Sequence, residues 1–243
     1  MSLCLYMIER EEYPIRINKY LAIKKVSTRR GADDLIKRGL VKINGKKAKL
    51  GDKINKGDKV DVSSKALEGR NFKYGAFYKP RGVVTHSPVK GEKSINDIID
   101  LGYLFPIGRL DKESEGLMIL TNDGRITDRL LNPIYEHEKE YSVKVREKTP
   151  NRIINILEKG IIDNGELLKA KKVSILQNGN LSIVLTQGKN HQIRRMLSFV
   201  RLTVEKLKRV RIMSVKTTGL AVGEMKILEG REREKFLRDL DLG

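Results

Sequence analysis

Apolar positions near the N-terminus predict a small module of two helices and a hairpin. They recur at helical spacing at Ile15, Ile17, Tyr20 and Leu21. Residues 28–38 predict a second helix, which Gly39 ends. The dipeptide Asn44–Gly45 stands between two short β-prone runs, which is a strong signal for a hairpin turn, and residues 59–62 predict a further strand. The module is therefore expected over residues 14–62.

From residue 74 onward the pattern is dominated by strands, several of which alternate between apolar and polar positions. The strands are expected at residues 74–80, 116–121, 140–146, 167–176, 181–188 and 208–217. Helical patterns are confined to residues 94–101, 126–132, 150–160, 191–200 and 231–242. Strands often follow one another without a helical crossover, so residues 74–243 predict an α+β domain with a mainly antiparallel sheet. The polar residues 63–73 show no periodicity and predict a linker.

Composition narrows the class of protein. The chain has 243 residues, of which 39% are hydrophobic and 33% charged, a balance typical of one or two globular domains. No apolar run approaches twenty residues, so no membrane span is expected, and the N-terminal segment lacks the pattern of a secretory signal. Cys4 is the single cysteine and the three histidines are scattered, which argues against a disulfide framework and a metal site. These features predict a cytoplasmic protein.

Basic residues are concentrated at the N-terminal end. The whole chain has 50 Lys and Arg against 31 Asp and Glu, a net charge of +19. Residues 14–70 alone contain 17 basic and 6 acidic side chains, a net +11 in under a quarter of the chain. Because a polyanion would relieve this repulsion, the module is expected to bind nucleic acid. The candidates for phosphate contacts are Lys19, Arg29, Arg30, Lys37, Lys42 and Lys46.

Four motifs carry a resemblance to a known family. They are GRLDKESEGLMILTNDG at 108–124, YKPRGVVT at 78–85, EKEYSVKV at 138–145 and GKNHQIRRM at 188–196. With the N-terminal module they resemble the bacterial ribosomal RNA pseudouridine synthases that carry an S-four-like RNA-binding module before the catalytic domain. Ser114 and the sequence EKEY at residues 138–141 are more similar to the corresponding residues of the large-subunit enzymes than to those of the small-subunit enzyme. Ser114 and His191 stand where family members often have Thr and Arg.

The resemblance implies isomerisation of a uridine in ribosomal RNA, most closely the 23S RNA of the large subunit. This reaction breaks a glycosidic bond and rejoins the base through carbon, so it requires no metal or organic cofactor. Asp111 is implied as the carboxylate that either attacks the sugar or removes a ribose proton. Arg194 is implied as the cation that keeps Asp111 ionised. By contrast, His191 is interpreted as a structural histidine and Arg195 as part of a solvated helix face.

The target base must leave its stack before it can react, at a cost of a few kcal/mol. Tyr141 resembles the family's aromatic residue that lies against the flipped base, and Arg109 the arginine that can fill the vacated stack. Lys139 lies two residues before Tyr141 on the same face of an expected strand, so it is a further candidate for an RNA contact.

Alternative functions and several properties stay open. A non-catalytic ribosome-assembly factor would keep the fold without the catalytic residues, and a nuclease would need a second carboxylate or a metal cluster. The substrate RNA could also be 16S, and either free rRNA or an assembly intermediate is a possible partner. A monomer is expected, although the sequence determines neither the oligomeric state nor the target uridine.

Overall fold

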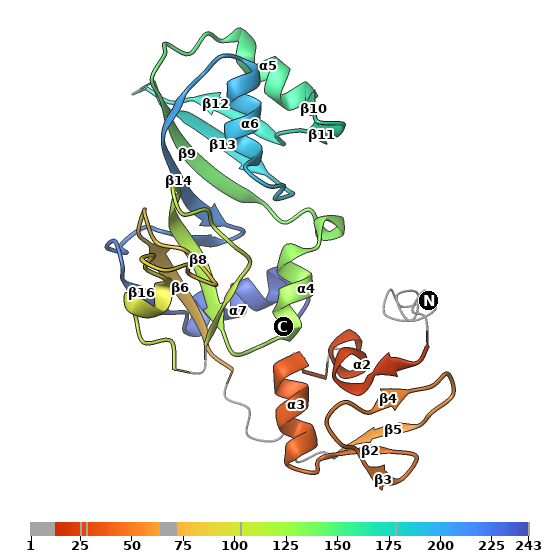
Figure 1. Ribbon diagram of the computed structural model, residues 1–243. Coiled ribbons are helices and arrows are strands. Elements are labelled where there is room, and N and C mark those ends of the chain that lie inside the picture. The colour runs from red at the N-terminus through yellow and green to blue at the C-terminus, as the bar shows by residue number, and fades with distance from the viewer. Residues whose placement is uncertain are drawn as a thin grey trace. The chain divides into compact units, whose positions relative to one another are not determined.

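The structure, a computed structural model, describes residues 13–24, 26–27, 29–63, 72–102, 104–177 and 179–242, without the side chain of Arg30 (Figure 1). Cys4, most of the expected linker and the Arg30 side chain therefore lie outside the described residues. The chain divides into two compact units, residues 1–72 with 123–127, and residues 73–122 with 128–243. No helix among the described residues is long and apolar enough to cross a membrane.

The first unit has two helices and short strands around its own core. Its elements are β1 (Ile15–Arg16), α2 (Ile17–Ile23), α3 (Arg29–Lys37), β2 (Val41–Ile43), β3 (Lys46–Lys47), β4 (Lys53–Ile54) and β5 (Val60–Val62). Ile17 and Leu21 of α2 are buried together with Leu35 and Ile36 of α3, as the helical spacing predicts. Ile15, which the same spacing included, instead forms β1 and pairs with Ile54. The dipeptide Asn44–Gly45, with φ of 49° and 79°, joins β2 to β3, so the predicted hairpin is confirmed.

A large mixed sheet forms the centre of the second unit. Its strands are β6 (Tyr74–Lys79), β7 (Phe105–Ile107), β8 (Glu115–Thr121), β9 (Lys139–Val145), β12 (Lys172–Ile175), β13 (Leu181–Leu185), β14 (Val204–Ile212), β15 (Val215–Lys216) and β16 (Met225–Ile227). Along the sheet the order is β12-β13-β9-β14-β8-β6-β16, with β7 on β8 and β15 on β14. Among the described strands, only the β14–β8 pair is parallel. The expected α+β class with a mainly antiparallel sheet is confirmed.

Helices and short elements surround this sheet. They are the 3₁₀ turns η2 (Ile95–Asp97) and η3 (Pro133–Tyr135), the helices α4 (Arg125–Leu131), α5 (Arg152–Lys159), α6 (Gln192–Phe199) and α7 (Gly230–Asp239), and the hairpin β10 (Ile161–Asp163) and β11 (Glu166–Leu168). In Figure 1, α5 and α6 lie at the end of the sheet that holds β12 and β13. The helix α7 packs near β6, where the rings of Phe236 and Tyr74 are 6.0 Å apart.

Three predicted elements are wrong in detail. Residues 167–176 form β11 and β12 instead of one strand, because Ala170 between them is fully buried and its N–H donates to Leu157. Residues 208–217 form a hairpin of β14 and β15, with Met213 at φ 51° in the turn. Residues 94–101 form only the 3₁₀ turn η2.

Gly116 allows β8 and β14 to come together. Its φ is +110°, and a Cβ built on it would lie 2.3 Å from the carbonyl oxygen of Arg209. No side chain fits there without moving the backbone of β14. The absence of a side chain at Gly116 is therefore a requirement of the only parallel pairing among the described strands.

A β-bulge interrupts β14 beside this contact. Arg209 lies opposite Tyr141 of β9, whereas Arg211 lies opposite Glu140, so two steps along β14 match one step along β9. Bulges shift the alternation of side chains. As a result Arg209 and Ile212 are both buried, while Arg211 donates hydrogen bonds to Glu138 and Glu140.

We predict that Gly116→Ala lowers the free energy of unfolding by about 4 kcal/mol or more, since it adds a backbone clash to the strain of a positive φ. The matched control is Gly165→Ala in the turn between β10 and β11, where φ is +76° and nothing lies within 4 Å of the added carbon. That variant should lose only about 1–2 kcal/mol. Urea unfolding of both variants measures the difference, and equal losses would contradict the close-contact explanation.

Candidate active site

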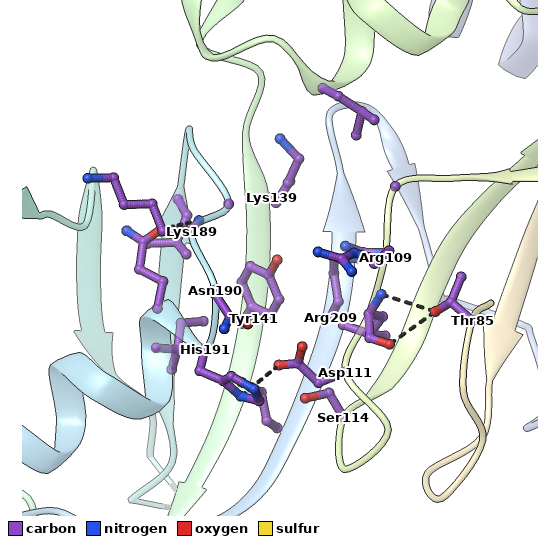
Figure 2. Close-up of a pocket in the computed structure, with 18 of the residues that line it drawn as sticks. Thr85, Arg109, Asp111, Ser114, Lys139, Tyr141, Lys189, Asn190, His191 and Arg209 are labelled. Atoms are coloured by element: carbon purple, nitrogen blue, oxygen red, sulfur yellow. Dashed lines mark hydrogen bonds and ion pairs between the residues drawn. The ribbon is translucent and has the colours of Figure 1, made fainter. Parts of the chain in front are cut away.

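A pocket of about 740 Å³ opens over the middle of the large sheet (Figure 2). Its floor comes from three adjacent strands, through Leu185 of β13, Tyr141 of β9 and Arg209 of β14. Its walls come from residues 84–86, 107–112 and 188–193. Segments far apart in the sequence thus meet at one concave site, which is where ligand sites are usually found.

Asp111 lies in the wall segment that leads into β8. Its side chain is 35% exposed, and its carbonyl oxygen accepts a hydrogen bond of 3.0 Å from the N–H of Ser114. Thr85 holds Leu110, the residue before Asp111. Its hydroxyl accepts a hydrogen bond from the N–H of Leu110 at 3.2 Å and donates one to the Leu110 carbonyl at 3.0 Å. Two hydrogen bonds with one side chain therefore hold the backbone immediately before Asp111.

His191 lies beside Asp111. Its Nδ1 lies 3.5 Å from the carboxylate Oδ2, and its side chain is 51% exposed at the pocket (Figure 2). His191 adopts φ 48° immediately before α6, and this left-handed conformation directs the ring toward Asp111. The histidine interpreted as structural therefore lies half exposed at the pocket, next to the candidate carboxylate.

The two arginines of α6 also differ from expectation. Arg194 donates a 3.0 Å hydrogen bond to the carbonyl of Glu113, and the ion pair expected between Arg194 and Asp111 is not formed. The reason is that α6 buries Ile193 and Leu197 against the sheet, which turns Arg194 toward the loop. Arg195 does not lie on a solvated face but forms ion pairs with Asp163 and Glu166.

Tyr141 and Lys139 share the buried face of β9 and both line the pocket. Tyr141 is 8% exposed, and the opposite residues on its two neighbouring strands are Ile183 and Arg209. Lys139 is 7% exposed, and its Nζ donates a long hydrogen bond of 3.4 Å to the carbonyl of His137. Burial, and secondarily the nearby charge of Arg209, lowers the pKa of Lys139 to about 8. Arg109 also lines the pocket, with an exposed side chain.

Two buried cations near Asp111 were not singled out from the sequence. Lys79 is fully buried at the end of β6 and donates to the carbonyls of Pro80 and Val83. Burial lowers its pKa to about 8, although the charge of Asp111 opposes this shift. Arg209 is 5% exposed, and its Nε donates to the carbonyl of Leu117 at 2.7 Å. Lys79 lies in the motif YKPRGVVT, whereas nothing in the local sequence indicates that Arg209 reaches the pocket.

The expected RNA-binding residues of the first unit lie on different elements. Arg29 and Lys37 are exposed on α3, whose other face buries Ala32, Leu35 and Ile36. Lys42 and Lys46 are exposed on β2 and β3, on either side of the hairpin turn. Lys19 is partly buried on α2, and the side chain of Arg30 lies outside the described residues.

The fold and the pocket are those of an RNA-modifying enzyme. The sequence model of the RNA pseudouridylate synthase family matches residues 73–199, so the chain belongs to this family of isomerases. An S4 domain matches residues 15–60.

The similar proteins include the dual-specificity RNA pseudouridine synthase RluF of Salmonella typhi, which is 38% identical over 89% of this chain and 76% of its own. The ribosomal large subunit pseudouridine synthase B of Bacillus subtilis is 35% identical over 94% of this chain and 98% of its own. A crystal structure of a pseudouridylate synthase, 28% identical, superimposes with a TM-score of 0.67 over 93% of this chain and 99% of that one.

We predict that Lys139→Met makes the protein more stable at pH 7, by roughly 3 kcal/mol, because it removes a charge buried with a lowered pKa. Between pH 8 and 10.5 the unfolded chain keeps the Lys139 proton that the folded chain has lost. The free energy of unfolding of the unmodified protein should therefore rise with pH in this window, with Lys79 contributing in the same direction.

Urea unfolding between pH 7 and 9.5 tests this, and the variant should show a smaller rise. Lys144→Met is the control, since Lys144 is an exposed lysine on the same strand. If Lys139→Met and Lys144→Met respond alike to pH, Lys139 is not the source of the effect.

Proposed function

We propose that the protein converts a uridine in ribosomal RNA of the large subunit to pseudouridine. The observation that carries the proposal is a carboxylate, Asp111, held at the wall of a pocket whose floor contains Tyr141. Membership in the RNA pseudouridylate synthase family and the names of the similar proteins support the same reaction. We further propose that the protein acts in the cytoplasm as a monomer.

In the proposed reaction Asp111 either attacks C1′ of the ribose or removes a ribose proton. In both routes the bond between C1′ and N1 breaks, and its electron pair leaves with the base. The base then turns and C5 bonds to C1′. In the first route this displaces the Asp111 carboxylate from C1′, and in the second the ribose regains the proton that Asp111 removed. The proton on C5 is released to water and N1 takes up a proton, so the product is an isomer of uridine. His191, whose Nδ1 lies 3.5 Å from the Asp111 carboxylate, would orient that carboxylate.

The flipped uracil would lie against Tyr141, where stacking contributes on the order of 1–3 kcal/mol. Arg109 is exposed at the pocket, which suits a side chain that enters the space left in the RNA. Lys139 would contact the nucleotide within the pocket. Arg194 would act indirectly, because its bond to the Glu113 carbonyl holds the loop that follows Asp111.

The S4 domain would anchor the RNA through phosphate contacts. The proposed contacts are Lys19, Arg29, Arg30, Lys37, Lys42 and Lys46. Such contacts form equally in the ground state and the transition state, so they would set the affinity for RNA and not the rate of the chemical step.

Two measurements test the proposal. Pseudouridines are mapped in 23S and 16S rRNA from a strain that lacks the gene, and one missing pseudouridine in 23S rRNA is expected. The purified protein is then assayed for tritium release from rRNA labelled at C5 of uridine. Loss from 16S rRNA would move the substrate to the small subunit, RNA binding without tritium release would favour an assembly factor, and strand scission would favour a nuclease.

Asp111→Asn should reduce pseudouridine formation to background, since an amide can neither attack C1′ nor remove a ribose proton at neutral pH. Its affinity for rRNA should be retained in a filter-binding assay. The matched control is Glu113→Gln, which neutralises another carboxylate in the same loop. The Glu113 carboxylate pairs with Arg81 at 3.1 Å. It should keep most of the activity, and multiple turnover by Asp111→Asn would remove Asp111 from the mechanism.

Replacing both Lys42 and Lys46 with Ala should weaken rRNA binding and reduce its salt dependence. If each lysine pairs with one phosphate, the slope of log affinity against log salt should fall by about 1.4–1.8 units in total. The rate at saturating RNA should stay unchanged. Replacing Lys53 and Lys56 with Ala removes the same charge from the same domain, and an equal change in slope there would indicate a general charge effect.

A further inference from the structure

Arg209 is a buried cation that the reaction scheme above does not use. Of its five N–H groups, the one on Nε donates to the carbonyl of Leu117 at 2.7 Å. Its Nη2 is buried and has no hydrogen-bond partner among the described residues. Unsatisfied buried donors are rare and costly, so each one calls for an explanation, and a bound group that supplies the missing acceptor is one such explanation.

The position of Arg209 points to a ligand in the pocket. Arg209 lines the pocket and lies directly opposite Tyr141 on the neighbouring strand, so the two side chains stand on the same face of the sheet (Figure 2). The bulge after Arg209 keeps Arg211 out of the pocket and pairs it with Glu138 and Glu140. Of these two neighbouring arginines, only Arg209 lacks a carboxylate partner among the described residues.

The charges of the pocket also favour an anionic ligand. Among the described residues that line it, Asp111 is the only carboxylate, whereas five are Lys or Arg: Arg109, Lys112, Lys139, Lys189 and Arg209. Arg109 and Lys112 are exposed, and Lys112 pairs with Glu92 at 2.9 Å, but Lys139 and Arg209 are buried at the floor. The base of a flipped nucleotide projects deeper than its phosphates, so the floor cations meet the base.

The base becomes negatively charged during the proposed reaction. When the bond between C1′ and N1 breaks, its electron pair passes to the uracil ring and spreads over N1, O2 and O4. A fixed cation in a site that excludes water stabilises such a charge without reorganising as it forms. We propose, on the basis of the proposed function, that Arg209 is a catalytic residue that stabilises the negative charge on uracil as it separates from the ribose.

The test compares two leaving groups in the rRNA segment identified by pseudouridine mapping, with uridine or 5-fluorouridine at the target position. Fluorine withdraws electron density and makes the departing base a more stable anion, so 5-fluorouracil needs less help from a cation. Single-turnover loss of the target nucleoside is followed by chromatography after digestion of the RNA. The unmodified protein must first convert the uridine RNA, and its failure there would refute the proposed function regardless of Arg209.

Arg209→Gln should slow the reaction of the uridine RNA by about 10²-fold and that of the 5-fluorouridine RNA by less than about tenfold. Arg209→Lys, which keeps the charge, should lose less of the reaction rate than Arg209→Gln. Its loss should also be smaller for the 5-fluorouridine RNA than for the uridine RNA. If Arg209→Gln fails to fold in a thermal melt, the same comparison with Arg209→Lys decides. Arg211→Gln is the matched control: it is the same substitution two residues away on the opposite face, and it should affect both RNAs equally.

Three results would overturn the inference. Equal losses for the two RNAs in the Arg209 variants would mean that Arg209 supports the structure and not the departing base. Weaker RNA binding with an unchanged single-turnover rate would mean that Arg209 binds a phosphate. Full activity of Arg209→Gln toward the uridine RNA would exclude a catalytic role.

Discussion

The pocket depends on the close backbone contact between β8 and β14 at Gly116. The loop that carries Asp111 leads directly into β8, and β14 brings Arg209 beside Tyr141 of β9. Both strands must therefore be adjacent before these side chains can share one site. A side chain at position 116 would collide with the carbonyl of Arg209. Because Gly116 has no Cβ atom, β8 can lie close to β14, and Asp111 can lie close to the floor of the pocket.

The charges around Asp111 are costly to bury. Lys79, Lys139 and Arg209 are all buried, and the lowered pKa values of the two lysines reflect the cost of burying their charges. The carbonyls of Pro80 and Val83 satisfy Lys79, but Lys139 has one long hydrogen bond and Arg209 is only partly satisfied. Functional sites commonly retain such local conflicts, while the apolar core around them stabilises the fold.

The local sequence predicts the helices and strands of this protein better than it predicts the contacts between them. The Asn44–Gly45 turn and the helical spacing of α2 follow from backbone preferences that act within a few residues. The break at Ala170 was missed because it depends on burial against a distant segment. In the site, sequence motifs identify Asp111 and Tyr141. The contact of His191 with Asp111, however, depends on the left-handed backbone before α6. The position of Arg209 depends on a bulge in β14. Neither geometry has a signal in the nearby residues.

The bulge in β14 also bears on how this strand should be aligned with those of similar proteins. Leu207, Arg209 and Ile212 face the pocket, and Val210 is the extra residue that breaks their even spacing. A strand that lacked Val210 would alternate regularly and would still present the same three side chains. Loss of Val210 can therefore leave the pocket unchanged. Glu205, the extra residue at the second register shift of β14, is a further position where one residue can be lost without exchanging the two faces of the strand. Alignment gaps in β14 belong at positions 205 and 210.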